Sequence, residues 1–232
     1  MYLNQLDIQT THDYARDMLN NNRDRLTNFE TAAQAICKVL YEDFTDDEGN
    51  PAFGLVRVFR VFERREMPDP LRPKVRHEVD HWLVLMGTYG LEADWCDPRK
   101  SRKHRVQPLD QDASAMVRAA TEQLGIVPGD LSSSSVSPLT MDQSGQLVRT
   151  FYVPVAAGSK HITDQDEFVK PYGIKSVVGI GTTFASQKAY MMLIFSRMHI
   201  DEYKRDLIAS MGPFVSTLLA IYDGRQAIWE TT

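Results

Sequence analysis

Two groups of residues in this chain have types and spacings that could do chemistry. The first, His77-Glu78-Val79-Asp80-His81, has the H-E-x-x-H spacing of zinc hydrolases. A helix would place both histidines of this spacing on one face, with the glutamate beside a metal-bound water. Prolines precede the segment and an apolar, β-rich run follows it, so we expect the entry to a strand, in which His77 and His81 lie roughly 13 Å apart. A zinc-dependent hydrolase using His77, Glu78 and His81 is therefore the weakest alternative.

The second group lies within residues 151–173, where a polar loop is flanked by aromatic side chains. His161 lies in the loop, and Tyr152, Phe168 and Tyr172 are close to it in sequence. Aromatic walls with a few polar groups are typical of a small-molecule pocket. The alternative is that Phe168 and Tyr172 only pack the loop onto the body of the domain.

Charge and cysteine content restrict the function classes. The formal net charge is −5, which argues against a dedicated nucleic-acid binder. Cys37 and Cys96 form no C-x-x-C motif, which is typical of a reducing cytoplasm, and Cys37 falls on an apolar helical stripe. We find neither a signal peptide nor a stretch of about 20 apolar residues, so we expect no direct membrane insertion. One basic cluster is either a solvated loop or an anion contact; it comprises Arg99, Lys100, Arg102, Lys103, His104 and Arg105.

The order of predicted elements indicates an α/β chain of the α+β kind, with a central antiparallel sheet and helices against it. In the strand predicted over residues 52–63, Phe53, Leu55, Arg57, Phe59 and Val61 lie on one face. The other predicted strands are 81–90, 106–109, 147–155, 175–181 and 189–195, with a turn around Ser186-Gln187 and a loop over 128–146. Helices are predicted over 10–43 with a break near 20–22, from 110 or 112 to 124, from 163 or 164 to 169, and over 201–222.

Apolar stripes run along both terminal helices. In the first, Leu19, Leu26, Phe29, Ala33, Ile36 and Leu40 recur at helical spacing, and in the last Tyr203, Leu207, Met211, Phe214, Leu218 and Ile221 do. Such stripes pack either on their own domain or in a dimer seam, and the sequence leaves both open.

Two segments carry a resemblance to a known family. Residues 95–109, WCDPRKSRKHRVQPL, resemble the pattern W-N-D-R-R-x-S-R-x-H-x-x-I-P-L. Residues 151–181 resemble F-x-V-P-E-A-A-G-S-x-Y-I, followed by F-V-x-P-Y-G-I-x-S-V-x-G-x-G. The chain is thereby similar to GAF-like sensory domains of bacterial signal-transduction proteins. It departs from the pattern at Cys96, Val155 and His161.

The resemblance implies a sensory fold with a pocket on one face of the sheet. It places Trp95, Arg102 and His104 in the pocket through the first segment, and Tyr152, His161, Phe168 and Tyr172 through the second. It also implies a helical extension over 1–24, the GAF-like domain over 25–223 and a C-terminal tail over 224–232. It identifies no cofactor or bound metal.

We therefore expect a cytoplasmic regulatory domain that is not an enzyme and that binds a small molecule or a partner. No output domain follows in the chain, so we expect a homodimer through the terminal helices that signals to a separate output protein. The alternative from a different class is a dimerising adaptor that binds no ligand.

Overall fold

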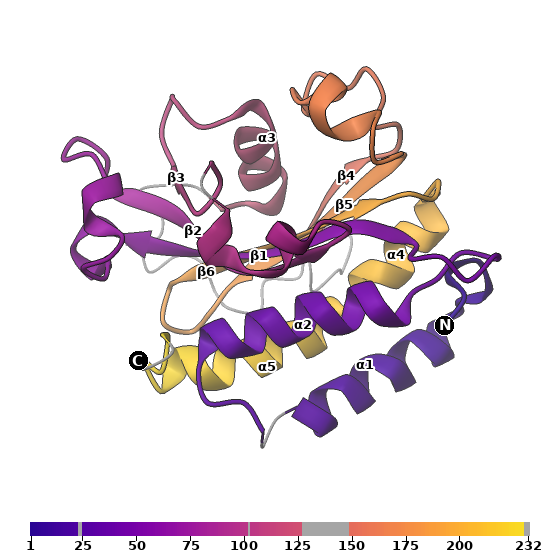
Figure 1. Ribbon diagram of the computed structural model, residues 1–232. Helices are drawn as coiled ribbons and strands as arrows, with labels where there is room; N and C mark the ends of the chain where they lie inside the picture. Colours follow the sequence, from indigo (N-terminus) through magenta and orange to yellow (C-terminus); the bar gives the residue numbers. More distant parts are fainter. Residues whose placement is uncertain (23–24, 102, 127–148, 230–232) are drawn as a thin grey trace.

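A six-stranded antiparallel sheet forms the centre of the computed structural model, which describes residues 1–22, 25–101, 103–126 and 149–229 (Figure 1). The strand order is β3-β2-β1-β6-β5-β4. The strands are β1 (Phe53–Glu63), β2 (His81–Gly90), β3 (Val106–Pro108), β4 (Arg149–Val153), β5 (Ser176–Thr183) and β6 (Ala189–Ser196). The expected α+β class with a central antiparallel sheet is confirmed.

Helices cover the two faces of the sheet unequally. A helical layer lies on one face, and another helix with irregular segments lies on the other (Figure 1). The layer consists of α1 (Ile8–Asn22), α2 (Phe29–Asp43), α4 (Glu202–Ser210) and α5 (Gly212–Gly224). The opposite face carries α3 (Ala115–Leu124) and a short π-helical turn, Gln165–Val169. Each face therefore has its own apolar core.

Alternation along β1 divides its side chains between these cores, as the sequence predicts. Val56, Val58 and Phe62 pack with the helical layer, whereas Leu55 and Phe59 pack on the opposite face. The prediction for Phe53 was wrong, because the register of β1 against β6 is irregular between Phe53 and Leu55. The irregularity turns Phe53 toward the helical layer, where its ring stacks on Phe44 at 5.3 Å between centroids.

The β5–β6 hairpin turns where the sequence predicts. Gln187 adopts a φ of 64°, and its backbone N–H donates to the carbonyl of Phe184 over 2.9 Å. The two strands pair from Ser176 with Ser196 to Thr183 with Ala189. This register places Leu193 and Phe195 of the central strand β6 on the face opposite the helical layer.

The last predicted helix is two helices. Asp201 caps the first by accepting from the backbone N–H of Lys204 over 2.8 Å, as expected. Pro213 lies in the first turn of α5, where its fixed φ and missing N–H start a helix and cannot continue one. Residues Glu202–Gly224 have a length and apolar composition that could cross a membrane, contrary to our reading of the sequence, and half of their 18-residue apolar window is buried inside the domain.

The terminal stripes pack on this domain. Phe29, Ile36 and Leu40 of α2 and Leu207 and Leu218 of the C-terminal helices are buried in the helical-layer core. One member of the predicted stripes differs, because Tyr203 is 60% exposed. The helix break predicted near residues 20–22 falls after Asn22, between α1 and α2.

Residues after α5 return to the start of α2. The carbonyl of Ala227 accepts from the N–H of Phe29 over 2.7 Å, and that of Ile228 accepts from Glu30 over 3.0 Å. Trp229 stacks on Phe62 with 5.2 Å between centroids. The domain bounds at 24/25 and 223/224 stay predictions, and the loop predicted over 128–146 lies outside the described residues.

Candidate functional site

A cavity of about 340 Å³ opens on the face of the sheet opposite the helical layer. Strands β1 and β6 form its floor, α3 forms one wall, and residues 162–172 form another. Small-molecule pockets have volumes of about 300–1,000 Å³, so this cavity fits a small ligand. Its lining consists of Leu55, Arg57, Phe59, Trp95, Lys103, His104, Gln107, Ser114, Met116, Val117, Ile162, Thr163, Asp164, Glu167, Phe168, Tyr172, Leu193 and Phe195.

Arg57 supplies a buried positive charge at the floor. It lies in β1 between Thr88 of β2 and Leu193 of β6, and only 9% of the residue is exposed. Its Nε is buried and has no hydrogen-bond partner among the residues that the structure describes. Burial lowers its pKa to about 10, and the opposing electrostatic effects of Cys37 and then Asp164 are smaller, so the group is charged at neutral pH. A buried guanidinium whose Nε has no partner among the described residues is costly, and an anionic group in the cavity could offset that cost.

His104 adds a neutral polar group to the same cavity. Its Nδ1 is buried and unpartnered within the described part of the chain. Burial, followed by the charges of Arg57 and Lys103, lowers the pKa of His104 to about 4. The imidazole is therefore uncharged at neutral pH, and one of its nitrogens can donate or accept a hydrogen bond with a ligand held by Arg57.

Four aromatic rings form one continuous wall. Trp95 contacts Tyr172 and Phe168, with centroids 4.5 Å and 5.6 Å away. Phe168 in turn meets Phe195 of β6 edge-on at 5.1 Å. Because Phe168 and Tyr172 come from the loop segment and Phe195 from the sheet, these contacts attach the loop to the floor while leaving a cavity beside it.

The mouth of the cavity carries charges of both signs. Lys103 and Glu167 approach each other to 3.8 Å, and both side chains are more than four-fifths exposed. Asp164 is also exposed and is close enough to Arg57 to influence its pKa. The mouth therefore carries one cation beside two carboxylates, and Arg57 supplies the positive charge of the buried floor.

The structure brings together four of the seven residues that the sequence suggests for a pocket. Trp95, His104, Phe168 and Tyr172 all line the cavity. Arg102 lies outside the described residues. His161 does not line the cavity; its ring meets Phe151 edge-on at 6.4 Å.

The structure places Tyr152 on the other face of the sheet. Phe151 and Val153 of β4 point to the cavity side, so alternation turns Tyr152 to the helical layer. There its hydroxyl donates to the carbonyl of Ile200, and Arg205 lies over its ring at 5.2 Å.

Sequence reasoning missed Arg57 as a site residue, although it placed the residue on the correct face of its strand. The available signal was an arginine in the middle of an apolar strand face. Such a residue needs either a partner or a function, because burying a lone charge is unfavourable.

The other candidate chemistry lies away from the cavity. His77 and Glu78 are in a turn and His81 begins β2, so the helix that zinc hydrolysis needs at this spacing is not formed. Among the described residues, moreover, no three His, Cys, Asp or Glu side chains are grouped so that they could hold a metal ion.

Neither thiol is positioned to react with a molecule in the cavity. Burial raises the pKa of the Cys37 thiol, which lies in the helical-layer core as expected. The Cys96 thiol donates to the carbonyls of Gly90 and Glu92, each over 3.6 Å, and does not line the cavity.

Most of the basic cluster serves local structure. Arg99 pairs with Asp97 at 3.2 Å, and Arg105 pairs with Glu30 at 2.8 Å behind the sheet. Of its described members, only Lys103 and His104 line the cavity. Among the described members of the cluster, Lys103 and His104 are therefore the two that could contact an anion in the cavity.

Comparison with known proteins identifies the fold. No family model and no curated protein sequence matches the chain. The GAF domain of a phosphoenolpyruvate-protein phosphotransferase from Coxiella burnetii superposes with a TM-score of 0.53 at 11% identity, covering 96% of this chain and 100% of that one. The GAF domain of A. aeolicus nlh2 gives 0.52 at 8% identity, covering 95% and 99%. The chain therefore has the GAF fold, as the resemblance implies.

The same fold also carries enzymes. Free methionine-R-sulfoxide reductase from Neisseria meningitidis, solved in complex with its substrate, superposes with a TM-score of 0.54 at 11% identity, covering 95% of this chain and 93% of that one. Our expectation that the chain is not an enzyme was therefore wrong, because proteins with this fold include enzymes such as this reductase.

Proposed function

We propose that this chain is a ligand-responsive regulatory domain that binds a small anionic organic molecule between the sheet and α3. The observation that carries the proposal is the buried Arg57 at the floor of a cavity with aromatic walls, whose Nε has no partner among the described residues. A ligand anion would supply a partner for the Nε of Arg57, and the aromatic wall would bury the ligand's apolar part.

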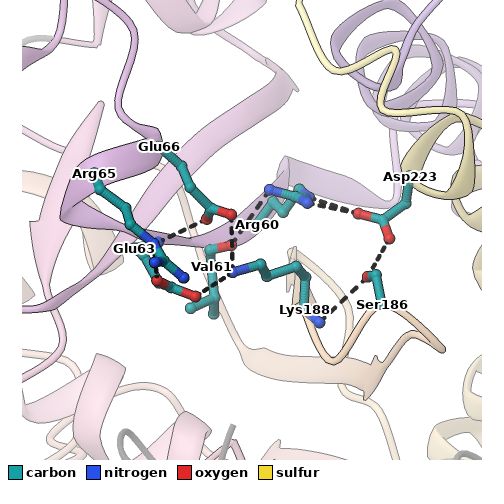
Figure 2. A network of polar contacts seen from close by, with 8 residues as sticks. All are labelled: Arg60, Val61, Glu63, Arg65, Glu66, Ser186, Lys188 and Asp223. Atoms are coloured by element: carbon teal, nitrogen blue, oxygen red, sulfur yellow. Dashed lines mark hydrogen bonds and ion pairs between the residues drawn. The ribbon is translucent and has the colours of Figure 1, made fainter. Parts of the chain in front are cut away.

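The signal would leave the site through β1. Arg60, on the other face of the same strand, donates from Nε and one terminal nitrogen to the same oxygen of Asp223, over 2.9 Å and 2.7 Å (Figure 2). Asp223 belongs to the last turn of α5 and also accepts from the hydroxyl of Ser186 in the β5–β6 turn. A ligand that shifts β1 would thus shift the balance between arrangements of α5, by as much as its affinity differs between them.

The ligand-free dimerising adaptor is less well supported. The predicted stripes are mostly buried in the helical-layer core, so they offer no seam to an adaptor or to a homodimer. An adaptor also needs no cavity. A homodimer through the terminal helices remains part of our proposal, and its contact would use the outer surface, where Ile8 is 52% and Tyr203 60% exposed.

The cellular setting and the partner are part of the same proposal. Both cysteines are free, which suits a reducing cytoplasm. The receiver of the signal would be a separate output protein that contacts the helical layer, and we propose neither a nucleic acid nor direct membrane insertion.

Amide hydrogen exchange tests whether the cavity and α5 respond together. The protein would be measured with and without the low-molecular-mass fraction of an extract from its own host. We expect slower exchange in β1 and in residues 162–172, a changed rate in α5, and no change in the Arg57→Met variant. Unchanged exchange throughout the wild-type chain would contradict the proposal.

A further inference from the structure

We propose that the ligand is a small aromatic monocarboxylate, with its carboxylate on Arg57 and its ring against Trp95, Phe168 and Tyr172. This inference rests on the proposed function, because it names the ligand class of the same cavity. Four properties of the cavity support it: the positive charge of its floor, the mixed charges at its mouth, its aromatic wall and its volume.

The floor favours a carboxylate. A guanidinium presents parallel N–H donors in one plane, and a carboxylate accepts two of them at once. Arg57 lies in the middle of the sheet and lines the cavity, so a carboxylate there could reach these donors. The neutral imidazole of His104 is the second polar group there, and its buried Nδ1 also lacks a partner within the described residues.

The charge distribution favours a single negative charge. Arg57 is the one buried cation in the described lining, and Lys103 stands at the exposed rim, where it is occupied by Glu167. Asp164 and Glu167 would repel a second negative charge near the mouth. For a dianion, repulsion by the carboxylates at the rim would therefore offset part of the electrostatic attraction to Arg57 at the floor.

The wall favours an aromatic body. Trp95 and Tyr172 lie 4.5 Å apart between centroids with their planes inclined by 56°, so they present both faces and edges. Aromatic pairs in such arrangements contribute beyond the area that they bury. Met116 of α3 also lines the cavity, and thioethers make favourable contacts with rings. An aliphatic ring of the same size would gain only the burial of its surface.

The volume limits the size. A cavity of about 340 Å³ is at the lower end for small-molecule sites. It suits one ring or two fused rings with a short acid side chain, and a tetrapyrrole would exceed it.

Calorimetric titration of the full chain with matched probes tests this class. The aromatic acids are benzoate, 4-hydroxybenzoate, phenylacetate and indole-3-acetate. Cyclohexylacetate keeps the acid without the aromatic ring, phenylacetamide keeps the ring without the charge, and cyclic AMP offers an aromatic monoanion without a carboxylate. We expect at least one aromatic acid to bind saturably, and cyclohexylacetate and phenylacetamide to bind about tenfold or more weakly than their matched acid, phenylacetate.

Two variants locate the binding. Arg57→Met should remove it, whereas Arg205→Met, on the helical face beside Tyr152, should leave it unchanged. Equal affinity for cyclohexylacetate and phenylacetate would overturn the aromatic assignment. Tighter binding of cyclic AMP, or a co-purified ligand of another class with no aromatic acid bound, would overturn the carboxylate while leaving the proposed function intact. Failure of every probe, with no co-purified ligand and no hydrogen-exchange response, would overturn both.

Discussion

Arg57 and Arg60 are two buried arginines on one strand with opposite surroundings. Arg60 faces the helical layer, where its guanidinium pairs with Asp223 at 2.7 Å and lies 4.5 Å from the centroid of Phe62. Arg57 faces the cavity, where its Nε has no partner among the described residues. The fold therefore gives the Arg60 guanidinium a carboxylate partner, whereas the part of the chain that the structure describes offers none to the Nε of Arg57.

This contrast predicts that the two arginines affect stability differently. Arg57→Met removes a buried charge whose Nε has no partner among the described residues, so we expect the free energy of unfolding to be unchanged or to rise. Arg60→Met leaves the Asp223 carboxylate buried without its cation, and we expect a loss of about 3–5 kcal/mol. Urea unfolding of both variants measures the difference. Equal destabilisation would mean that Arg57 has a structural partner after all.

The Arg60–Asp223 pair should behave as a coupled unit. Asp223→Leu alone should cost about 3–5 kcal/mol, because it strands the Arg60 guanidinium in the core. The double variant Arg60→Met, Asp223→Leu should be more stable than either single variant, since a pair of apolar residues leaves no buried charge. A double-mutant cycle in urea would give this coupling, and simple additivity of the two losses would contradict it.

Gly87 permits the close approach of α2 to the sheet. A Cβ at this position would lie 2.4 Å from the backbone carbonyl atoms of Ala33 in α2. We expect Gly87→Ala to lower the free energy of unfolding by about 1–3 kcal/mol, because backbone cannot move aside as a side chain can. Gly224→Ala is the matched control, since nothing lies within 4 Å of its added Cβ, and it should change stability by less than about 0.5 kcal/mol. Comparable losses in the two variants would refute this account of the packing.

His104 should make the ligand-free protein less stable in mild acid. Its pKa is about 4 in the fold against an ordinary value of 6.5, so between these values the unfolded chain binds more protons. The contribution of the neutral ring is fully present above pH 6.5 and is lost as the pH falls toward 4. The loss is at most about 3 kcal/mol, and less because the ring is only partly buried. Unfolding measured from pH 7 to pH 4 should show a shallower decline in His104→Gln than in the wild type, and equal slopes would contradict this role.

Local patterns predicted the sheet well. The strand at residues 81–90 matches β2, because alternation and the flanking turn residues are short-range signals. Trp95, His104, Phe168 and Tyr172 could be placed in one site only through the resemblance, since the first two and the last two come from separate segments. Arg57 needed a burial argument that the resemblance did not supply.

Other features depend on contacts that no local pattern reveals. The capping of α2 by Ala227 and Ile228 joins backbone groups far apart in the chain. Tyr152 was wrongly predicted to line the pocket because it is aromatic and close to the loop in sequence. The alternation of side chains along its strand would have placed it on the face opposite Phe151 and Val153. The break at Pro213 was a local signal that the apolar stripe concealed.

Native mass spectrometry of the wild type and the Arg57→Met variant, purified side by side from the natural host, tests the central claim most directly. We predict a mass excess corresponding to one small organic acid on the wild type and none on Arg57→Met, with both proteins folded. The same mass excess on both proteins would contradict the claim that Arg57 holds a ligand in this cavity. The claim would also fail if neither protein carried an excess and host metabolites did not slow hydrogen exchange in the wild type.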